Sequence, residues 1–157
     1  MMKLTNVLVA VVAITAMEMS APVLAETGAS KGIGPMTEIK LESLSESMAK
    51  QGKEVFNAKC SMCHKMEERY VGPALNDVFK RRTPEWIGNI ILNPIEMTQK
   101  DPAAQELLAE YLTQMTFQNI SNEQARQIIE YFRYYSEKGD LTEPKVEAKS
   151  KAKSKTK

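Results

Sequence analysis

Apolar residues between positions 47 and 138 recur every three or four residues, which is the spacing of amphipathic helices. We therefore predict an all-α fold. The pattern predicts helices over 47–58, from 84 to a stop at Pro94, over 103–113 and over 122–138, with 76–82 as a short helix or loop.

Three of the predicted helix starts carry capping signals. Thr83-Pro84-Glu85 supplies an N-cap, a proline at the first helical position and an acid in the first turn. Asp101-Pro102 repeats the cap and the proline, and Ser121-Asn122-Glu123-Gln124 is a capping box. Gly139 is expected to end the last helix.

Gly52 lies inside the first predicted helix, four residues before Phe56 and on the same face. A glycine there costs about 1 kcal/mol relative to alanine, so we expect a packing reason. The last helix offers an apolar stripe as the partner of this face, with Tyr131 and Tyr135 at its margins. We predict that the first and last helices cross, and that the stripe consists of Ala125, Ile128, Ile129 and Phe132.

The first 25 residues are organised like a secretory signal peptide. A lysine precedes an apolar run over 4–17, and small residues at Val23 and Ala25 suit a signal peptidase. An uncleaved membrane anchor is the alternative, but Glu18 interrupts the run well short of the roughly 20 residues that a span needs. We therefore predict a periplasmic protein that begins at Glu26 and has no membrane span in its mature chain.

Two further segments flank the predicted domain, which covers residues 45–139. Residues 26–44 contain three glycines and a proline that argue against regular structure, so we predict a flexible leader without chemistry. Residues 140–157 lack apolar periodicity, and Lys145–Lys157 holds six lysines with Glu147 as its only acid. This tail is predicted to be disordered. It either solvates the chain or docks to an acidic partner or anionic lipid.

The overall composition is ordinary for a single soluble domain. Hydrophobic residues make up 43% of the chain, charged residues 26%, and the formal net charge is +1. This balance gives no reason to invoke nucleic acid as a partner.

The clearest chemical signal is the run Cys60-Ser61-Met62-Cys63-His64, a C-x-x-C-H motif. In this motif the two thiols add to the vinyl groups of a porphyrin, and the following imidazole binds the iron. Residues three apart on a helical turn lie side by side, so Cys60 and Cys63 reach one macrocycle while His64 projects toward its metal. We predict one covalently attached haem c.

Three other interpretations of the two cysteines explain the sequence less completely than haem attachment does. A structural zinc site needs four ligands, whereas the chain has two cysteines and one histidine. A thioredoxin-like pair is expected beside a βαβ pattern, and no strand-rich flank is present. A structural disulfide would leave the adjacent single histidine unexplained. Haem attachment accounts for all three residues.

Together with Gly52, Phe56, Gly72-Pro73-x-Leu75 and a late methionine before the terminal helix, the motif resembles the small monohaem class I cytochromes c. The resemblance implies a cytochrome c fold of four to five short helices wrapped around one covalently bound haem. It also implies that the carbonyl of Pro73 accepts the Nδ1 proton of the haem histidine. An indole N–H or an arginine often bonds to a haem propionate in this family, and the candidates are Trp86, Arg81 and Arg82.

The second axial ligand must reach the other face of the haem, and a methionine is the usual choice in a chain without a second histidine. Methionines in and beside the motif cannot reach around the ring, which leaves Met97 and Met115. Met115 lies between two helices, just before the capping box, where the family places its ligand. The family usually has proline after this methionine, whereas this chain has Thr116. We predict Met115 as the ligand, with Met97 as the alternative.

Iron that is bound on both faces can only exchange electrons. We predict a periplasmic single-electron carrier that is not an enzyme and docks transiently to a redox donor and an acceptor around an exposed haem edge. A peroxidase would need a distal base, and His64 is already used. Two alternatives remain: a dedicated haem subunit of a dehydrogenase or terminal reductase, and a five-coordinate gas-binding or sensor haem protein.

Overall fold

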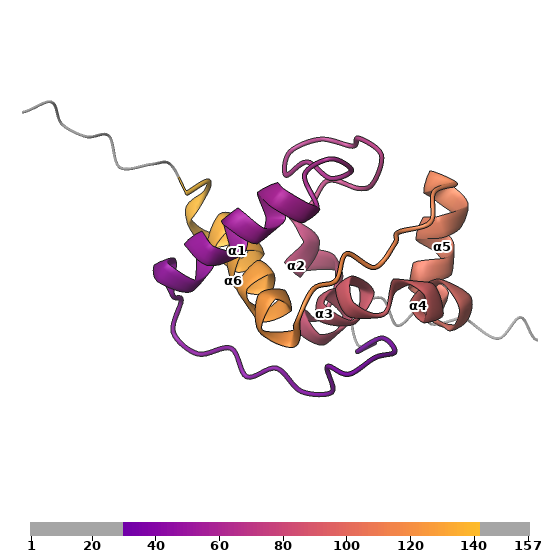
Figure 1. Cartoon of the computed structure of the whole chain (residues 1–157), viewed down its shortest axis with the longest axis horizontal. Coiled ribbons are helices and arrows are strands. Elements are labelled where there is room, and N and C mark those ends of the chain that lie inside the picture. The colour runs from indigo at the N-terminus through magenta and orange to yellow at the C-terminus, as the bar shows by residue number, and fades with distance from the viewer. Residues whose placement is uncertain (1–29, 142–157) are drawn as a thin grey trace, which may run out of the picture.

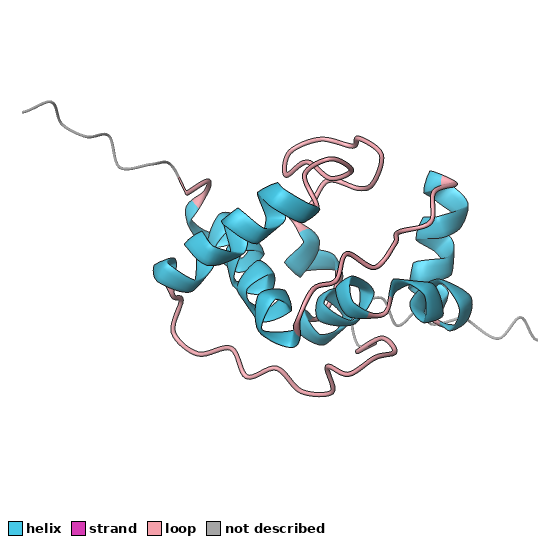
Figure 2. Cartoon of the chain, in the orientation of Figure 1, coloured by secondary structure: helices cyan, strands magenta, loops and turns pink. Residues whose placement is uncertain are grey.

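The computed structural model describes residues 30–141 of the chain. This range consists of helices and connecting loops and contains no strand (Figure 1, Figure 2), so the all-α prediction is confirmed. None of these described helices is long and apolar enough to cross a membrane. The helices are α1 (Glu46–Lys59), α2 (Val78–Arg81), α3 (Pro84–Leu92), α4 (Pro94–Lys100), α5 (Pro102–Tyr111) and α6 (Asn122–Lys138).

The described range holds six helices rather than the expected four to five, and α4 is the additional one. The sequence predicts that a helix stops at Pro94, and α3 does end at Leu92, but it does not predict that Pro94 begins a new helix. Asn93 serves both as the C-cap of α3 and as the N-cap of α4. Proline suits a first helical position because an N–H there would have no partner within the helix. The chain therefore turns at Asn93 and continues as α4.

The three predicted capping signals are observed. The side chains of Thr83, Asp101 and Ser121 each accept an N–H from the first turn of α3, α5 and α6 respectively. Helix α5 ends at Tyr111, short of the predicted residue 113, because Leu112 adopts a left-handed backbone conformation with φ of 52°. This turn leads the chain from α5 into an irregular segment before α6.

Helices α1 and α6 cross in close contact (Figure 1), as predicted. A Cβ atom at Gly52 would overlap the backbone carbonyl of Gln127, so only glycine allows this approach. The ring centroid of Phe56 lies 5.6 Å from that of Tyr131 and 5.7 Å from that of Phe132. Aromatic pairs at such distances stabilise a core beyond the area that they bury. The crossing therefore forms the centre of the main core.

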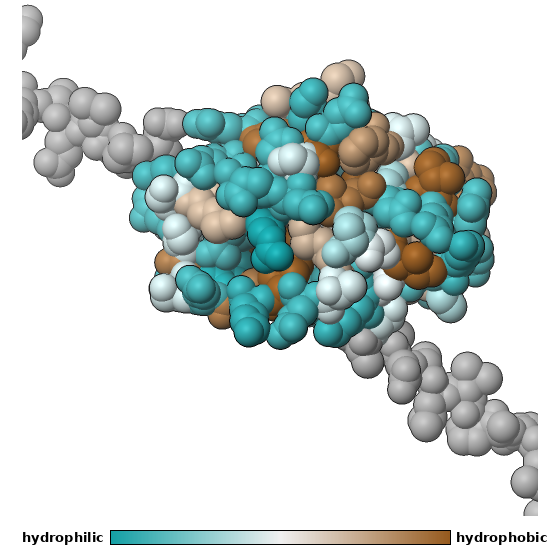
Figure 3. Space-filling model, turned by 60° about the horizontal axis from the view of Figure 1, so that its bottom comes forward, coloured by the Kyte–Doolittle hydropathy of each residue, from teal (hydrophilic) through white to brown (hydrophobic). Residues whose placement is uncertain are grey.

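The buried apolar side chains form two clusters. The smaller one, Trp86, Met97 and Ala104, joins α3, α4 and α5. Outside the core the surface is mainly polar, and on the face in Figure 3 the hydrophobic residues form separate patches among hydrophilic ones. The larger cluster consists of Met36, Ala49, Phe56, Leu75, Val78, Ile87, Ile91, Ile120, Ala125, Ile128, Ile129, Tyr131, Phe132 and Leu141.

Residues 30–44, part of the predicted flexible leader, run past α3 and α4 to the start of α1 (Figure 1). We call this segment the strap. Met36 is buried, and its backbone N–H and C=O both bond to the side-chain amide of Asn89. Near α1, Arg133 donates to the carbonyl of Glu42. The strap thus departs from the expected flexible leader. It has no regular secondary structure to satisfy its backbone N–H and C=O groups, and side chains of Asn89 and Arg133, which are distant in the sequence, bond to them instead.

Candidate functional site

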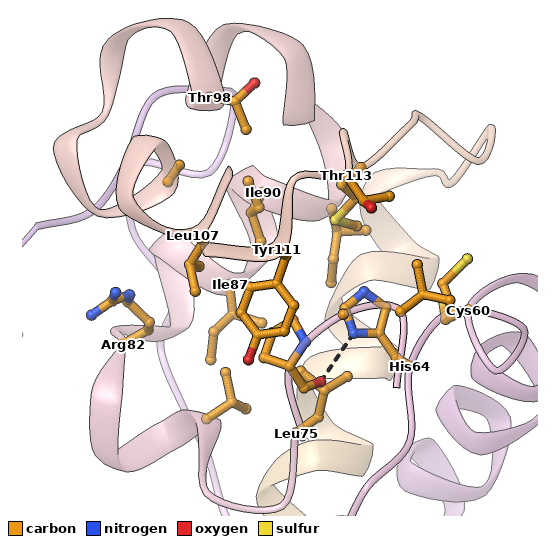
Figure 4. Close-up of a pocket in the computed structure, with 18 of the residues that line it drawn as sticks. Cys60, His64, Leu75, Arg82, Ile87, Ile90, Thr98, Leu107, Tyr111 and Thr113 are labelled. Atoms are coloured by element: carbon orange, nitrogen blue, oxygen red, sulfur yellow. Dashed lines mark hydrogen bonds between the residues drawn. The ribbon is translucent and has the colours of Figure 1, made fainter. Parts of the chain in front are cut away.

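An apolar cavity lies between the loop after α1, helices α3 and α5, and the segment that follows α5. Figure 4 shows Ile87 and Ile90 of α3 and Tyr111 of α5 around the same space as His64. Every residue predicted for the site lines this cavity: Cys60, Cys63, His64, Pro73, Arg81, Arg82, Trp86 and Met115.

The C-x-x-C-H run forms a tight turn at the end of α1. Cys60 is the C-cap of that helix, and its N–H donates to the carbonyl of Phe56. The N–H groups of Cys63 and His64 both donate to the carbonyl of Cys60, at 3.0 and 2.9 Å. This turn brings both cysteines and the imidazole to one wall of the cavity, and no disulfide joins the two cysteines.

The electrostatic environment of Cys60 argues against a thioredoxin-like redox pair. Burial raises the pKa of Cys60 to about 11, and the nearby Cys63 acts in the same direction. A thioredoxin-like pair depends on a thiol whose pKa is lowered, so the surroundings of Cys60 do not suit that chemistry.

His64 is held in place by the Gly72-Pro73 turn. Its Nδ1 lies 3.2 Å from the carbonyl oxygen of Pro73, and this contact is drawn as the dashed line in Figure 4. A Cβ atom at Gly72 would overlap the imidazole, so glycine is required where the turn passes the ring. Burial lowers the pKa of His64, with the bond to Pro73 opposing it, which favours a neutral ring. A neutral imidazole that donates from Nδ1 leaves Nε2 available for a metal.

The two candidate methionines occupy different surroundings. Met115 is half-buried and lines the cavity together with His64. Met97 is fully buried in the smaller cluster, and its sulfur accepts the N–H of Ile33 at 2.9 Å. Met97 is not among the cavity residues, so its packing in the core accounts for it.

Trp86 does not play the role that the resemblance suggested. Its indole N–H donates to the carboxylate of Asp101 at 2.9 Å, in a buried position. An indole has a single N–H, so this bond leaves nothing to offer a propionate. The sequence missed the pairing because Asp101 reads as the N-cap of α5, a role that the same carboxylate also fills by accepting the N–H of Ala104.

The two arginines at the end of α2 both line the cavity but differ in their contacts. Arg82 lies over the ring of Trp86, 4.9 Å from its centroid. Arg81 donates from Nη2 to the carbonyl of Ala74 and pairs with Asp77 at 2.8 Å. Its Nε is buried and has no hydrogen-bond partner among the described residues. A buried donor of this kind needs an acceptor, and a haem propionate would supply one.

Helix α5 contributes residues to which the sequence assigned no functional role. Leu107, Leu108 and Tyr111 follow the predicted apolar stripe, yet they are only half-buried and line the cavity. The signal available in the sequence was the position of this apolar stripe shortly before the candidate ligand Met115. These apolar walls, together with two thiols, an imidazole, a thioether and the orphaned Arg81 Nε, fit a haem c.

An all-α domain with a C-x-x-C-H turn on the wall of an apolar cavity defines a c-type haem protein. The profile of the family Cytochrome c matches residues 49–136. The chain belongs to the cytochrome c family, in which one covalently attached haem c carries electrons.

Solved structures agree with the family. A cytochrome c from Rhodothermus marinus is 45% identical, with a TM-score of 0.65, and the match covers 66% of this chain and 90% of that one. An engineered form of the Rhodothermus marinus protein, bound to a carbene intermediate, is 43% identical over 66% of this chain and 91% of that one, with a TM-score of 0.62. The cytochrome c domain of pp3183 protein from Pseudomonas putida is 25% identical over 54% and 87%, with a TM-score of 0.50. Comparison with curated proteins gives no match.

Proposed function

We propose that this protein is a periplasmic monohaem electron carrier whose iron is bound by His64 and Met115. The observation that carries the proposal is that these two side chains line one cavity, while Met97 is enclosed in a separate cluster. Cys60 and Cys63 would hold the haem through thioether bonds beside His64. With both axial positions taken, no site remains for a substrate at the iron, and we propose no enzymatic activity.

Haem c supplies one-electron exchange between ferrous and ferric iron. The chain's own residues adjust that exchange. The carbonyl of Pro73, 3.2 Å from Nδ1 of His64, increases the basicity of the imidazole and fixes its tautomer. The thioether of Met115 would favour the ferrous state and so raise the reduction potential. Arg81 and Arg82 would meet the propionates, and the buried Nε of Arg81 supports this role.

The proposed location and partners extend beyond the described residues. The predicted signal peptide at residues 1–25 and residues 142–157 of the predicted lysine-rich tail lie outside the described range. The first two residues of that tail depart from the predicted disorder, because Lys53 bonds to Asp140 and Leu141 is buried in the larger core cluster. Attachment of c-type haem takes place outside the cytoplasm in bacteria, which supports export and cleavage before Glu26. Electron donor and acceptor proteins would dock transiently around the haem edge, and the tail would either solvate the chain or contact an acidic partner or anionic lipid.

The ligand assignment is tested by spectra of the purified holoprotein and two methionine variants. Methionine bound to ferric haem gives a band near the red end of the visible spectrum. We expect Met115→Ala to abolish this band, lower the reduction potential and let the reduced protein bind carbon monoxide. Met97→Leu is the matched control and is expected to keep the band. The reverse result would move the ligand to Met97.

The same preparation separates the proposal from its rivals. Carbon monoxide binding by the reduced parent protein would indicate five-coordinate iron and favour a gas-binding or sensor function. Stable co-purification with a dehydrogenase or terminal reductase would favour a dedicated haem subunit. The N-terminal residue of the purified protein tests the predicted cleavage, with Glu26 as the expected result.

A further inference from the structure

The segment that carries Met115 is weakly tied to the rest of the domain. Residues 113–120 contain no helix, and within residues 30–141 none of them takes part in a backbone–backbone hydrogen bond. Asn119 has a left-handed backbone with φ of 55°, and Phe117 is 47% exposed. A segment with these properties opens readily unless side chains hold it.

Ile120, at the end of this segment, is buried in the larger core cluster, and one hydrogen bond links the segment to another element. The hydroxyl of Thr98 on α4 has one proton and three acceptors within reach: Oε1 of Gln114 at 2.9 Å, and the carbonyls of Pro94 and Ile95 at 3.0 Å each. Oε1 of Gln114 is the nearest of the three, and the amide of Gln114 donates from Nε2 to the carbonyl of Met115 at 2.9 Å. Among the described residues, the Thr98–Gln114 pair is the only hydrogen bond from 113–120 to any other element. Gln114 therefore connects the backbone of Met115 directly to α4.

Helix α4 is itself firmly anchored. Met97, the residue before Thr98, is fully buried, and its sulfur accepts the N–H of Ile33 in the strap at 2.9 Å. At the start of the helix, the side chain of Asn93 donates to the carbonyl of Ile33 at 3.2 Å. The N–H and the carbonyl of Ile33 in the strap thus both bond to side chains at α4. These bonds hold the helix that carries the hydroxyl of Thr98 in place.

We propose that Gln114 is a positioning residue that holds Met115 toward the cavity through its bond to Thr98. This inference rests on the proposed role of Met115 as the axial ligand. Loss of the Thr98–Gln114 bond would make the segment open more often, so that an added ligand competes more successfully for the iron. A single hydrogen bond of ordinary strength corresponds to a change of about fivefold in that competition.

Imidazole is the probe, and its binding to the ferric holoprotein is followed by loss of the band near the red end of the spectrum. Thr98→Val and Gln114→Leu are each expected to tighten apparent imidazole binding about fivefold. Thr98→Ser keeps the hydroxyl and should bind imidazole as the parent does. Gln127→Leu is the matched control and should change nothing, because this glutamine does not line the cavity and its amide bonds to Gln51 of α1.

The double variant Thr98→Val with Gln114→Leu decides whether the two residues act through one contact. If they do, the double variant binds imidazole no more tightly than either single variant. The inference would be overturned if the fold change in imidazole affinity of the double variant equalled the product of the two single fold changes. Parent-like imidazole binding in both single variants would overturn it as well. Thermal unfolding of each holoprotein identifies any variant that does not fold. If the Gln114 variants do not fold, the comparison of Thr98→Val with Thr98→Ser still tests the loss of the hydroxyl.

Failure of the inference is distinguishable from failure of the proposed function. A red-end band that survives Met115→Ala would remove the ligand assignment itself. A band that disappears in Met115→Ala, together with parent-like imidazole binding in the Thr98 and Gln114 variants, would leave the ligand in place and overturn only the role of Gln114.

Discussion

The side-chain amide of Asn89 pairs with both backbone polar groups of Met36. The N–H of Met36 donates to Oδ1 at 2.8 Å, and Nδ2 donates to the carbonyl of Met36 at 2.9 Å. Asn89 is 1% exposed, and the same amide also reaches the carbonyl of Lys31. A single side chain on α3 therefore holds the middle of the strap.

We expect Asn89→Ala to lower the free energy of unfolding by about 2–3 kcal/mol, because it leaves buried backbone groups of the strap without partners. Chemical denaturation of the holoprotein measures this change. Gln51→Ala, which removes one exposed side-chain bond to Gln127, is the control and should stay within about 0.5 kcal/mol of the parent. Equal stabilities of the two variants would show that the bonds of Asn89 to the strap contribute nothing to stability.

Gly52→Ala is expected to lower the free energy of unfolding by about 3 kcal/mol or more. The added methyl group would overlap the carbonyl of Gln127, and both helix backbones would have to move apart. Helix propensity alone would make the alanine variant more stable by about 1 kcal/mol. A loss of stability would therefore show that the close packing of the two helices outweighs propensity. Glu54→Ala, at an exposed position of α1, controls for propensity and should change little. A Gly52→Ala variant more stable than the parent would contradict the observed crossing.

Trp86→Phe is expected to reduce stability while leaving the haem spectrum unchanged. The change removes the indole N–H that bonds to Asp101 and leaves a buried carboxylate oxygen with one partner fewer, at a cost of about 1–3 kcal/mol. Since that N–H is not available to a propionate, the reduction potential should not move. Denaturation and a redox titration on the same sample provide both readings, and a clear shift in potential would restore Trp86 as a haem contact.

Tyr135 should make stability fall at alkaline pH. The hydrogen bond from its hydroxyl to Glu67, with burial and the charge of Glu67 contributing, raises its pKa to about 12 from an ordinary 10.0. The folded protein therefore keeps a proton that the unfolded chain releases, and the stabilisation present below pH 10 is lost as the pH rises toward about 12.

Tyr135→Phe tests this dependence. The variant should be less stable than the parent at neutral pH, and the difference should shrink through the same alkaline range. Tyr70→Phe, at an exposed tyrosine, is the control for the loss of one phenolic hydroxyl. A gap between parent and Tyr135→Phe that stays constant with pH would mean that Tyr135 does not titrate abnormally.

The sequence alone determined the features that depend on neighbouring residues. The turn from Cys60 to His64 and the caps at Thr83, Asp101 and Ser121 involve atoms a few residues apart, so spacing and residue type suffice to predict them. The apolar stripe of α6 was equally readable, because the period of a helix repeats along the chain whatever it packs against.

Only the tertiary structure decided between partners that lie far apart in the sequence. Met97 and Met115 are chemically equivalent, and their surroundings differ because the strap meets α4 at Ile33. The indole of Trp86 bonds to Asp101, and the strap bonds to Asn89, through contacts that no local pattern encodes. Such contacts form when helices pack, and packing depends on the shape of the whole core rather than on the spacing of residues within one element.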